Sequence, residues 1–84
     1  MPIPDNIDEE KLAEVALAIL SLGAFSDSYG IRAWKGMDWD VTDILYRKGW
    51  IGDPKSKAKS VNLTAEGEKL SREYLDKHFL KDQL

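Results

Sequence analysis

Apolar positions near the N-terminus recur at the spacing of one helix face, Asp5 or Asp8 can cap its start, and Gly23 supplies a stop signal. This pattern predicts a helix over residues 8–22 whose inward stripe is Leu12, Val15, Ala16, Ile19 and Leu22. Leu17 and Leu20 fall outside the stripe, so the apolar surface is wider than a small core needs. Either the helix is central and fully buried, or Leu17 and Leu20 form a dimer face.

The next stretch, residues 24–37, has no sustained period until a short alternation around 30–34 predicts a strand. Ser26, Asp27 and Ser28 before it are typical turn residues. A second helix is predicted over 39–48, because Asp38 can cap it and Gly49 can end it. Its inward residues are Val41, Ile44 and Leu45.

Residues 50–63 are predicted to double back as a paired ribbon. Trp50 and Ile51 begin one strand, a turn follows at 53–56, and residues 60–63 return. Thr64 then caps a last helix, in which Gly67 indicates close backbone contact. The inward residues of this helix are predicted to be Leu70, Tyr74, Leu75 and Phe79.

The order of elements predicts one α+β domain over residues 1–84 with a small winged-helix-like plan: helix, irregular or strand segment, helix, β-hairpin wing, helix. One feature departs from that plan. A helix-turn-helix protein would carry another helix between the first two, and SDSYGIRAWKG is poor helix material.

Two stretches resemble known families. DILYRKGWIGDPKSKAKSVNLTAEGEKL, residues 43–70, looks like the helix, wing and helix of MarR-type winged-helix regulators. RAWKGMDWDV (32–41) followed by KGWIGDPKSKAKSVNLTAEG (48–67) resembles a family of small bacterial proteins of unknown function. The second resemblance implies the same small fold and carries no catalytic residues to this sequence.

Composition excludes several classes of protein. The 84 residues contain no cysteine, so a disulfide framework or a thiolate metal site is impossible. No apolar run is long enough to span a membrane, and the N-terminus lacks the features of a signal peptide. We therefore expect a cytoplasmic protein with no membrane partner and no cofactor.

The net charge of −3 is unevenly distributed. Residues 1–28 carry one lysine against six acids, residues 29–64 carry seven basic residues against four acids, and residues 65–84 carry four against five. The balances of −5, +3 and −1 add up to −3, so the middle of an acidic chain is mildly basic. That distribution is compatible with a nucleic acid or an acidic protein surface as partner.

Two groups of residues are candidates for contact. Lys55, Lys57 and Lys59 can reach phosphates from the wing, or they can keep the edge of the hairpin from pairing with another chain. Arg32, Trp34 and Lys35, with Tyr29 and Trp39 nearby, interleave cations with aromatic rings. Such a mixture suits stacking on unpaired bases or docking of a partner, and also core packing. We expect Trp34 to be exposed, and Trp39 and Trp50 to be buried.

Other chemistry is weakly supported. Asp38, Asp40 and Asp43 at the start of the second helix would repel duplex phosphates, and their spacing lacks the glycine and distal glutamate of a calcium loop. Neither a nucleophile beside a base nor a phosphate loop is evident, and His78 is expected to be exposed on the last helix. The sequence therefore favours a non-catalytic binding module. The first hypothesis is nucleic-acid binding through the basic wing, and the alternative is protein interaction or homodimerisation through the helix over 8–22.

Overall fold

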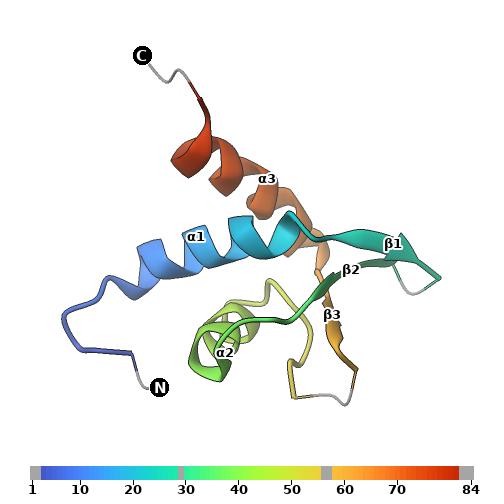
Figure 1. Cartoon of the computed structure of the whole chain (residues 1–84), viewed down its shortest axis with the longest axis horizontal. Helices are drawn as coiled ribbons and strands as arrows, with labels where there is room; N and C mark the ends of the chain where they lie inside the picture. The colour runs from blue at the N-terminus through green and yellow to red at the C-terminus, as the bar shows by residue number, and fades with distance from the viewer. Residues whose placement is uncertain (1–2, 29, 56–57, 82–84) are drawn as a thin grey trace.

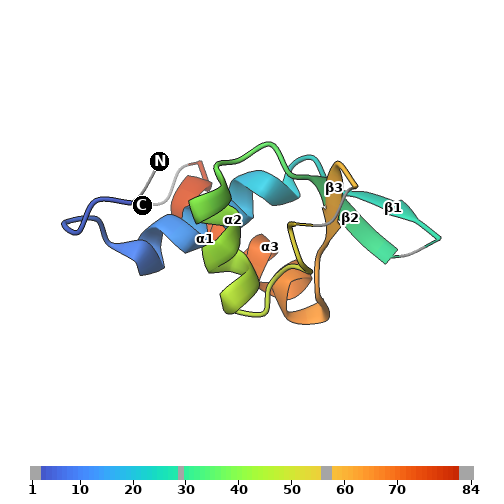
Figure 2. The ribbon, with the colours of Figure 1, turned by 90° about the horizontal axis from the view of Figure 1, so that it is seen from below.

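The computed structural model describes residues 3–28, 30–55 and 58–81. Within them, three helices and a three-stranded antiparallel sheet of order β1-β2-β3 confirm the α+β class. The elements are α1 (Glu9–Ser21), β1 (Phe25–Asp27), β2 (Gly30–Trp34), α2 (Trp39–Arg47), β3 (Ser60–Asn62) and α3 (Ala65–Phe79). In Figure 1, α1 crosses the middle with α3 on one side and α2 on the other. The hairpin of β1 and β2 projects away from the helices in both ribbon views (Figures 1 and 2).

Helix α1 starts where expected, because the Asp8 carboxylate accepts a hydrogen bond from the Lys11 N–H at 3.1 Å. Its buried face is not the predicted one. Leu17 and Leu20 are 0% and 5% exposed and lie in the core, so the prediction of a dimer face there is wrong. Ile19 and Leu22, predicted to be inward, are 48% and 69% exposed.

The physical reason is the position of α1 between α3 and α2, which buries Ala13, Ala16, Leu17 and Leu20 as one i, i+3, i+4, i+7 face. Almost every residue from 12 to 22 is apolar, so this face and the predicted one fit the helical period equally well. Tertiary packing, not periodicity, chooses between them.

The predicted strand over 30–34 is confirmed as β2, and a further strand, β1, lies beside it. The turn predicted at Ser26 and Asp27 is wrong, because both residues belong to β1. Gly30 begins β2 with a φ of +104°, a conformation that other residues rarely adopt. Ala33 of β2 pairs with Val61 of β3, and both are buried against the helices.

Among the described residues, the ribbon predicted over 50–63 is paired at its base only. Ile51 forms an isolated antiparallel bridge with Leu63, and the Gly52 N–H donates to the Asn62 carbonyl at 3.0 Å. The longer partner of β3 is β2. The last residue of the predicted turn over 53–56 lies outside the described residues, as does residue 57.

Local signals at the ends of α2 and α3 are confirmed. Asp38 accepts from the Asp40 N–H at 3.0 Å, and Gly49 ends α2 with a φ of +79°. Thr64 Oγ1 accepts from the Gly67 N–H at 3.0 Å and donates to the Gly49 carbonyl at 2.6 Å. One hydroxyl group therefore caps α3 and joins it to the end of α2.

Close packing at the start of α3 explains its glycine. A Cβ atom on Gly67 would collide with the backbone carbonyl of Trp50, so the expected close contact is confirmed. Trp50 itself is buried, as predicted, and its ring lies 5.5 Å from that of Tyr74. Phe79, predicted to be inward, is instead half exposed near the end of the helix.

Three polar side chains join α1 to α3. Glu14 Oε1 lies 2.8 Å from Lys77 Nζ and 2.9 Å from His78 Nε2. The hydrogen bond from Lys77, and then that from His78, lower the pKa of Glu14, and the same contact with Glu14 raises the pKa of Lys77. The prediction of an exposed His78 is wrong, because its side chain is only 13% exposed.

Among the described residues, no helix has the length and hydropathy needed to cross a membrane.

Candidate functional site

The sheet presents one face to the helices and the other to the surface. Side chains alternate along a strand, so Arg32 and Trp34, on either side of the buried Ala33, point away from the helices. The residues that face them in β1 and β3 point the same way. We call this surface the outer sheet face. It consists of Phe25, Arg32, Trp34, Ser60 and Asn62.

Trp34 is the largest exposed group on the outer sheet face. It is 60% exposed, which confirms its predicted exposure, and its ring packs against Phe25 with centroids 5.1 Å apart and planes tilted by 36°. Phe25 comes from β1, opposite Arg32 in the register, so the diagonal pair depends on the strand that the sequence did not reveal. Phe25 supports one side of the indole and leaves much of it open.

Arg32 lies beside Trp34 on the same face and is held by Ser60. Its Nε donates to Ser60 Oγ at 2.9 Å, and its Nη2 donates to the Ser60 carbonyl at 2.8 Å. Two hydrogen bonds to one residue fix the plane of the guanidinium group. Arg32 is therefore a fixed cation on the outer sheet face.

Lysines extend this positive charge along one edge. The Lys35 N–H donates to the Lys59 carbonyl at 3.1 Å, and its ammonium group donates to the Pro54 carbonyl at 2.6 Å. Lys55 and Lys59 are exposed. These contacts bring the end of β2 close to Pro54 and Lys59, which are far from it in the sequence, at one edge of the sheet. Lys57 and Tyr29, also candidates from the sequence, lie outside the described residues.

The N-terminus of α2 borders this edge and is acidic. The Asp40 N–H holds the pKa of Asp38 below its usual range. Trp39 follows, and the Lys35 ammonium lies 5.9 Å from its ring centroid. Trp39 is 60% exposed, so the prediction that it belongs to the core is wrong. With Lys35, Met37 and Thr42 it lines a small hollow of about 120 Å³.

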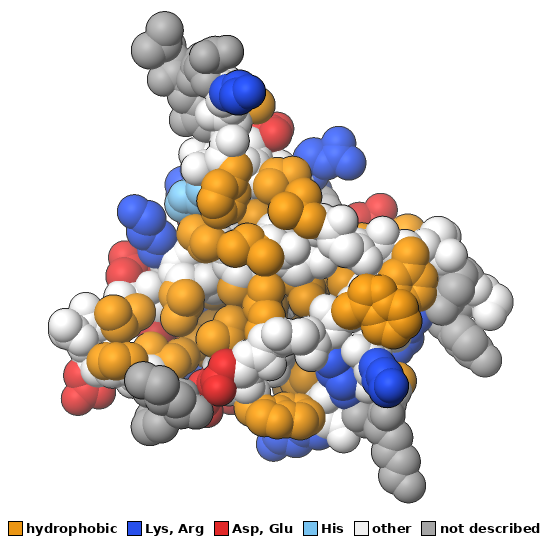
Figure 3. Space-filling view, viewed as in Figure 1, with side chains coloured by type: hydrophobic (Ala, Val, Ile, Leu, Met, Phe, Trp, Pro, Cys, Tyr) orange, Lys and Arg blue, Asp and Glu red, His pale blue; other side chains and the backbone are white. Residues whose placement is uncertain are grey.

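Figure 3 shows the two kinds of side chain together. Over β2 and β3, lysine and arginine side chains lie next to large hydrophobic ones. A second hydrophobic band crosses the middle of the same view over α1. The basic and aromatic mixture is thus a feature of the sheet end of the molecule.

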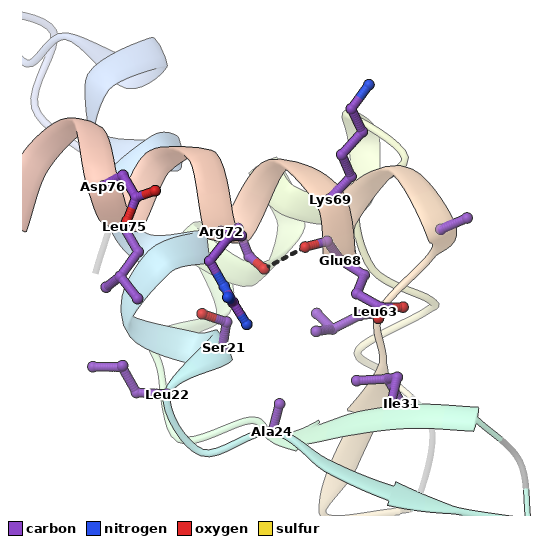
Figure 4. A pocket seen from close by; sticks show the side chains of 12 residues that line it. Ser21, Leu22, Ala24, Ile31, Leu63, Glu68, Lys69, Arg72, Leu75 and Asp76 are labelled. Atoms are coloured by element: carbon purple, nitrogen blue, oxygen red, sulfur yellow. Dashed lines mark hydrogen bonds between the residues drawn. The ribbon is translucent and has the colours of Figure 1, made fainter.

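A groove of about 760 Å³ opens on the other side of the sheet, between α3 and the end of α1. Figure 4 shows Ile31 and Leu63 at its floor and Leu22 and Leu75 on its walls. Arg72 reaches into it from α3 toward Ser21. No signal in the sequence placed these side chains together, because the groove forms only when three separate elements meet.

The charges around the groove balance. Its lining includes two cations, Lys69 and Arg72, and two acids, Glu68 and Asp76. Arg72 has no hydrogen-bond or ion-pair partner among the described residues, so nothing fixes its guanidinium group as Ser60 fixes that of Arg32. The groove can accept an apolar group, but it offers no net charge to select a ligand.

Within the described residues, no cluster of three or more His, Asp or Glu side chains could hold a metal ion.

Comparison with known proteins gives two matches. A family model described as "Domain of unknown function (DUF6429)" matches residues 8–81. The chain is also similar to "Uncharacterized protein y4hR" of Sinorhizobium fredii, at 41% identity over 76 residues, which cover 90% of this chain and 99% of the relative. No solved structure matches.

Proposed function

The chain belongs to the family described as a domain of unknown function, DUF6429, and from its own surface we propose that it is a cytoplasmic, non-catalytic module that binds nucleic acid. The resemblance of residues 32–41 and 48–67 to a family of small bacterial proteins of unknown function is confirmed, and it assigns no activity. The proposal rests on the outer sheet face and on the basic edge beside it, which consists of Lys35, Lys55 and Lys59.

One observation carries the proposal. Exposed Trp34, fixed Arg32 and three lysines, Lys35, Lys55 and Lys59, lie around a single sheet edge in a chain that is acidic overall. Cations next to exposed aromatic rings suit a polyanion whose bases can also contact the rings. An enzyme would need a nucleophile beside a base, and we place no such pair in this surface.

We also propose that the fold is a reduced winged-helix plan. The order α1, β2, α2, ribbon and α3 supports this, as does the pairing of β2 with the returning strand β3. In the described residues, a single helix, α2, connects β2 to the ribbon, and the hairpin of β1 and β2 stands before it. The wing would contact its partner through Lys55 and Lys59, and α2 would not enter a duplex groove.

The test is fluorescence anisotropy with labelled oligonucleotides across a range of salt concentrations. Each phosphate contact contributes roughly 0.7 to 0.9 to the slope of log affinity against log salt concentration. The double variant Lys55→Ala/Lys59→Ala should therefore lose up to about 1.4 to 1.8 of that slope and bind more weakly.

The matched control is Lys69→Ala/Arg72→Ala, which removes the same charge from exposed positions of α3 beside the groove. It should bind like the unsubstituted protein apart from a small general loss of attraction. Equal weakening of both double variants, or affinity that does not respond to salt, would show that the basic edge is not the contact surface.

A second candidate function is homodimerisation through α1. Ile19 and Leu22 are one turn apart on this helix and are 48% and 69% exposed, which favours an apolar contact with a partner surface. Leu17 and Leu20 take no part in it, since the core of the same chain covers them.

Sedimentation velocity over a range of concentrations tests this candidate. Ile19→Glu/Leu22→Glu should convert a dimer to a monomer while the free energy of unfolding changes by less than about 1 kcal/mol. Tyr46→Glu, at an exposed position of α2, is the control and should leave the dimer intact. A strict monomer at high micromolar concentration removes this function.

A further inference from the structure

We propose that the outer sheet face selects single-stranded over duplex nucleic acid by stacking one unpaired base on Trp34 and a neighbouring base on Arg32. This inference rests on the proposed function and goes beyond it, because a protein can bind phosphates without touching a base. It assigns the class of nucleic acid and the two residues that recognise it.

Trp34 offers the first surface on which a base can stack. Its indole is 60% exposed, and Phe25 packs against it from β1. The ring is thus held at the surface and keeps area for a planar partner. In a duplex the base faces are covered by their neighbours, whereas an unpaired base can leave its stack and lie on an aromatic side chain.

Arg32 supplies a second flat surface beside the first. Ser60 fixes its guanidinium plane with two hydrogen bonds, and Arg32 and Trp34 are two residues apart on one strand face. That separation is roughly 6.6 Å along a strand, about twice the 3.4 Å between stacked bases of one strand. Two successive bases could occupy the two surfaces only if they unstack, which a single strand allows.

The charges around the outer sheet face also favour single-stranded nucleic acid over a duplex. Lys35 and Lys59 are joined by a backbone hydrogen bond at the end of β2, so phosphates of a strand lying on the sheet would meet cations at this edge. Asp38 and Asp40 lie at the N-terminus of α2, the end of a recognition helix that normally meets the major groove. These carboxylates oppose insertion of α2 into a duplex.

The test compares a labelled oligothymidine of about 12 nucleotides with a duplex of the same length at about 50 mM salt. The protein should bind the single strand more tightly than the duplex. Trp34→Ala should weaken binding of the single strand by about 5- to 150-fold, the range expected for loss of one stacked base, and leave the duplex nearly unaffected. Trp34→Phe should keep most of the affinity, because it retains a ring on which a base can stack.

Trp39→Ala is the matched control, because Trp39 is equally exposed but lies outside the outer sheet face. It should change the affinity for the single strand by no more than about threefold. Far-UV circular dichroism and thermal unfolding check that each variant is folded. Truncation of an exposed ring leaves the core in place, so the variants should pass this check.

Three outcomes would overturn the inference. The first is tighter, salt-dependent binding of the duplex, which would leave the proposed function standing. The second is unchanged affinity of folded Trp34→Ala for the single strand, or an equal loss in Trp39→Ala. The third is absence of binding to both probes, which would remove the proposed function as well.

Discussion

The two faces of the sheet come from the same strands but lie in different surroundings. On the inner face Ala33 and Val61 are buried under the helices, and Leu63 continues this packing beyond β3. On the outer face Trp34 is exposed and Arg32 is half-buried. Alternate residues of β2 therefore serve the core and the surface in turn.

The arginines on the two sides of the sheet differ in the same way. Arg32 is fixed by Ser60, while Arg72 reaches into the groove without a partner in the described part of the chain. A fixed side chain loses little further freedom when it binds a ligand, so preorganisation favours the outer face as the recognition surface. The inner side is organised for stability, and substitutions should separate the two roles.

The largest effect is expected at Gly67 on the packed side. Gly67→Ala should lower the free energy of unfolding by roughly 3 kcal/mol, because its Cβ would collide with the Trp50 backbone and force α3 away. Helix propensity alone predicts the opposite sign, a gain of up to about 1 kcal/mol. Chemical denaturation measures the change directly.

Gly36→Ala is the control for this prediction. An added Cβ would meet nothing within 4 Å at Gly36, so stability should stay the same or rise slightly. If Gly67→Ala is as stable as the unsubstituted protein, α3 and Trp50 are not in close contact, and the contrast between the two sides of the sheet is weaker than described.

A smaller effect is expected for Ser60→Ala on the outer face. It removes the hydroxyl acceptor of Arg32 Nε and leaves the carbonyl contact, so stability should fall by about 1 kcal/mol. Affinity for a single strand should fall by about two- to fivefold, because the guanidinium plane is less fixed.

Ser71→Ala provides the comparison for Ser60→Ala. Ser71 is also buried, and its hydroxyl donates to the Glu68 carbonyl on α3, away from the outer sheet face. It should change stability by a comparable amount and leave affinity unchanged. Equal loss of affinity in both variants would mean that general destabilisation, not the position of Arg32, controls binding.

The smallest effect concerns Glu14, which joins α1 to α3. The Lys77 hydrogen bond, followed by that of His78, lowers its pKa, so its contribution is present above the pKa of the unfolded chain and is lost as pH falls through the folded-state value. The stability difference between the unsubstituted protein and Glu14→Gln should be largest near neutral pH and should shrink as pH falls below the pKa of a glutamate in the unfolded chain, about 4.3. Urea unfolding at several pH values measures it, and a difference independent of pH would contradict the assignment.

The sequence predicts those parts of the fold whose cause is local. Asp8, Asp38 and Thr64 begin helices because their side chains accept backbone N–H groups a few residues away. Gly49 ends α2 because its positive φ costs other residues energy. These signals need no knowledge of the rest of the chain.

Features that depend on contact between distant segments could not be predicted. Ser26 and Asp27 are common in turns, yet pairing with β2 makes them part of a strand. The buried face of α1 is chosen by α2 and α3, because the residues from 12 to 22 are nearly all apolar. Burial of His78 likewise depends on Glu14, far away in the sequence.

The candidate site was partly visible in the sequence for the same reason. Arg32, Trp34 and Lys35 are close in sequence, and their mixed character is evident there. Phe25 and Ser60, which support Trp34 and Arg32, enter through the register of β1 and β3 with β2. The prediction that Trp39 is buried is wrong because a tryptophan at the start of an amphipathic helix fits the core and the surface equally well.

The hydroxyl of Thr64 has a consequence for how the molecule opens. It bonds to Gly49 and to Gly67 at once, so fraying at the end of α2 and loosening at the beginning of α3 break a shared connection. Amide protons at these two places should exchange with solvent as one cooperative unit. Loss of the Thr64 hydrogen bonds therefore frees the end of α2 and the start of α3 at the same time.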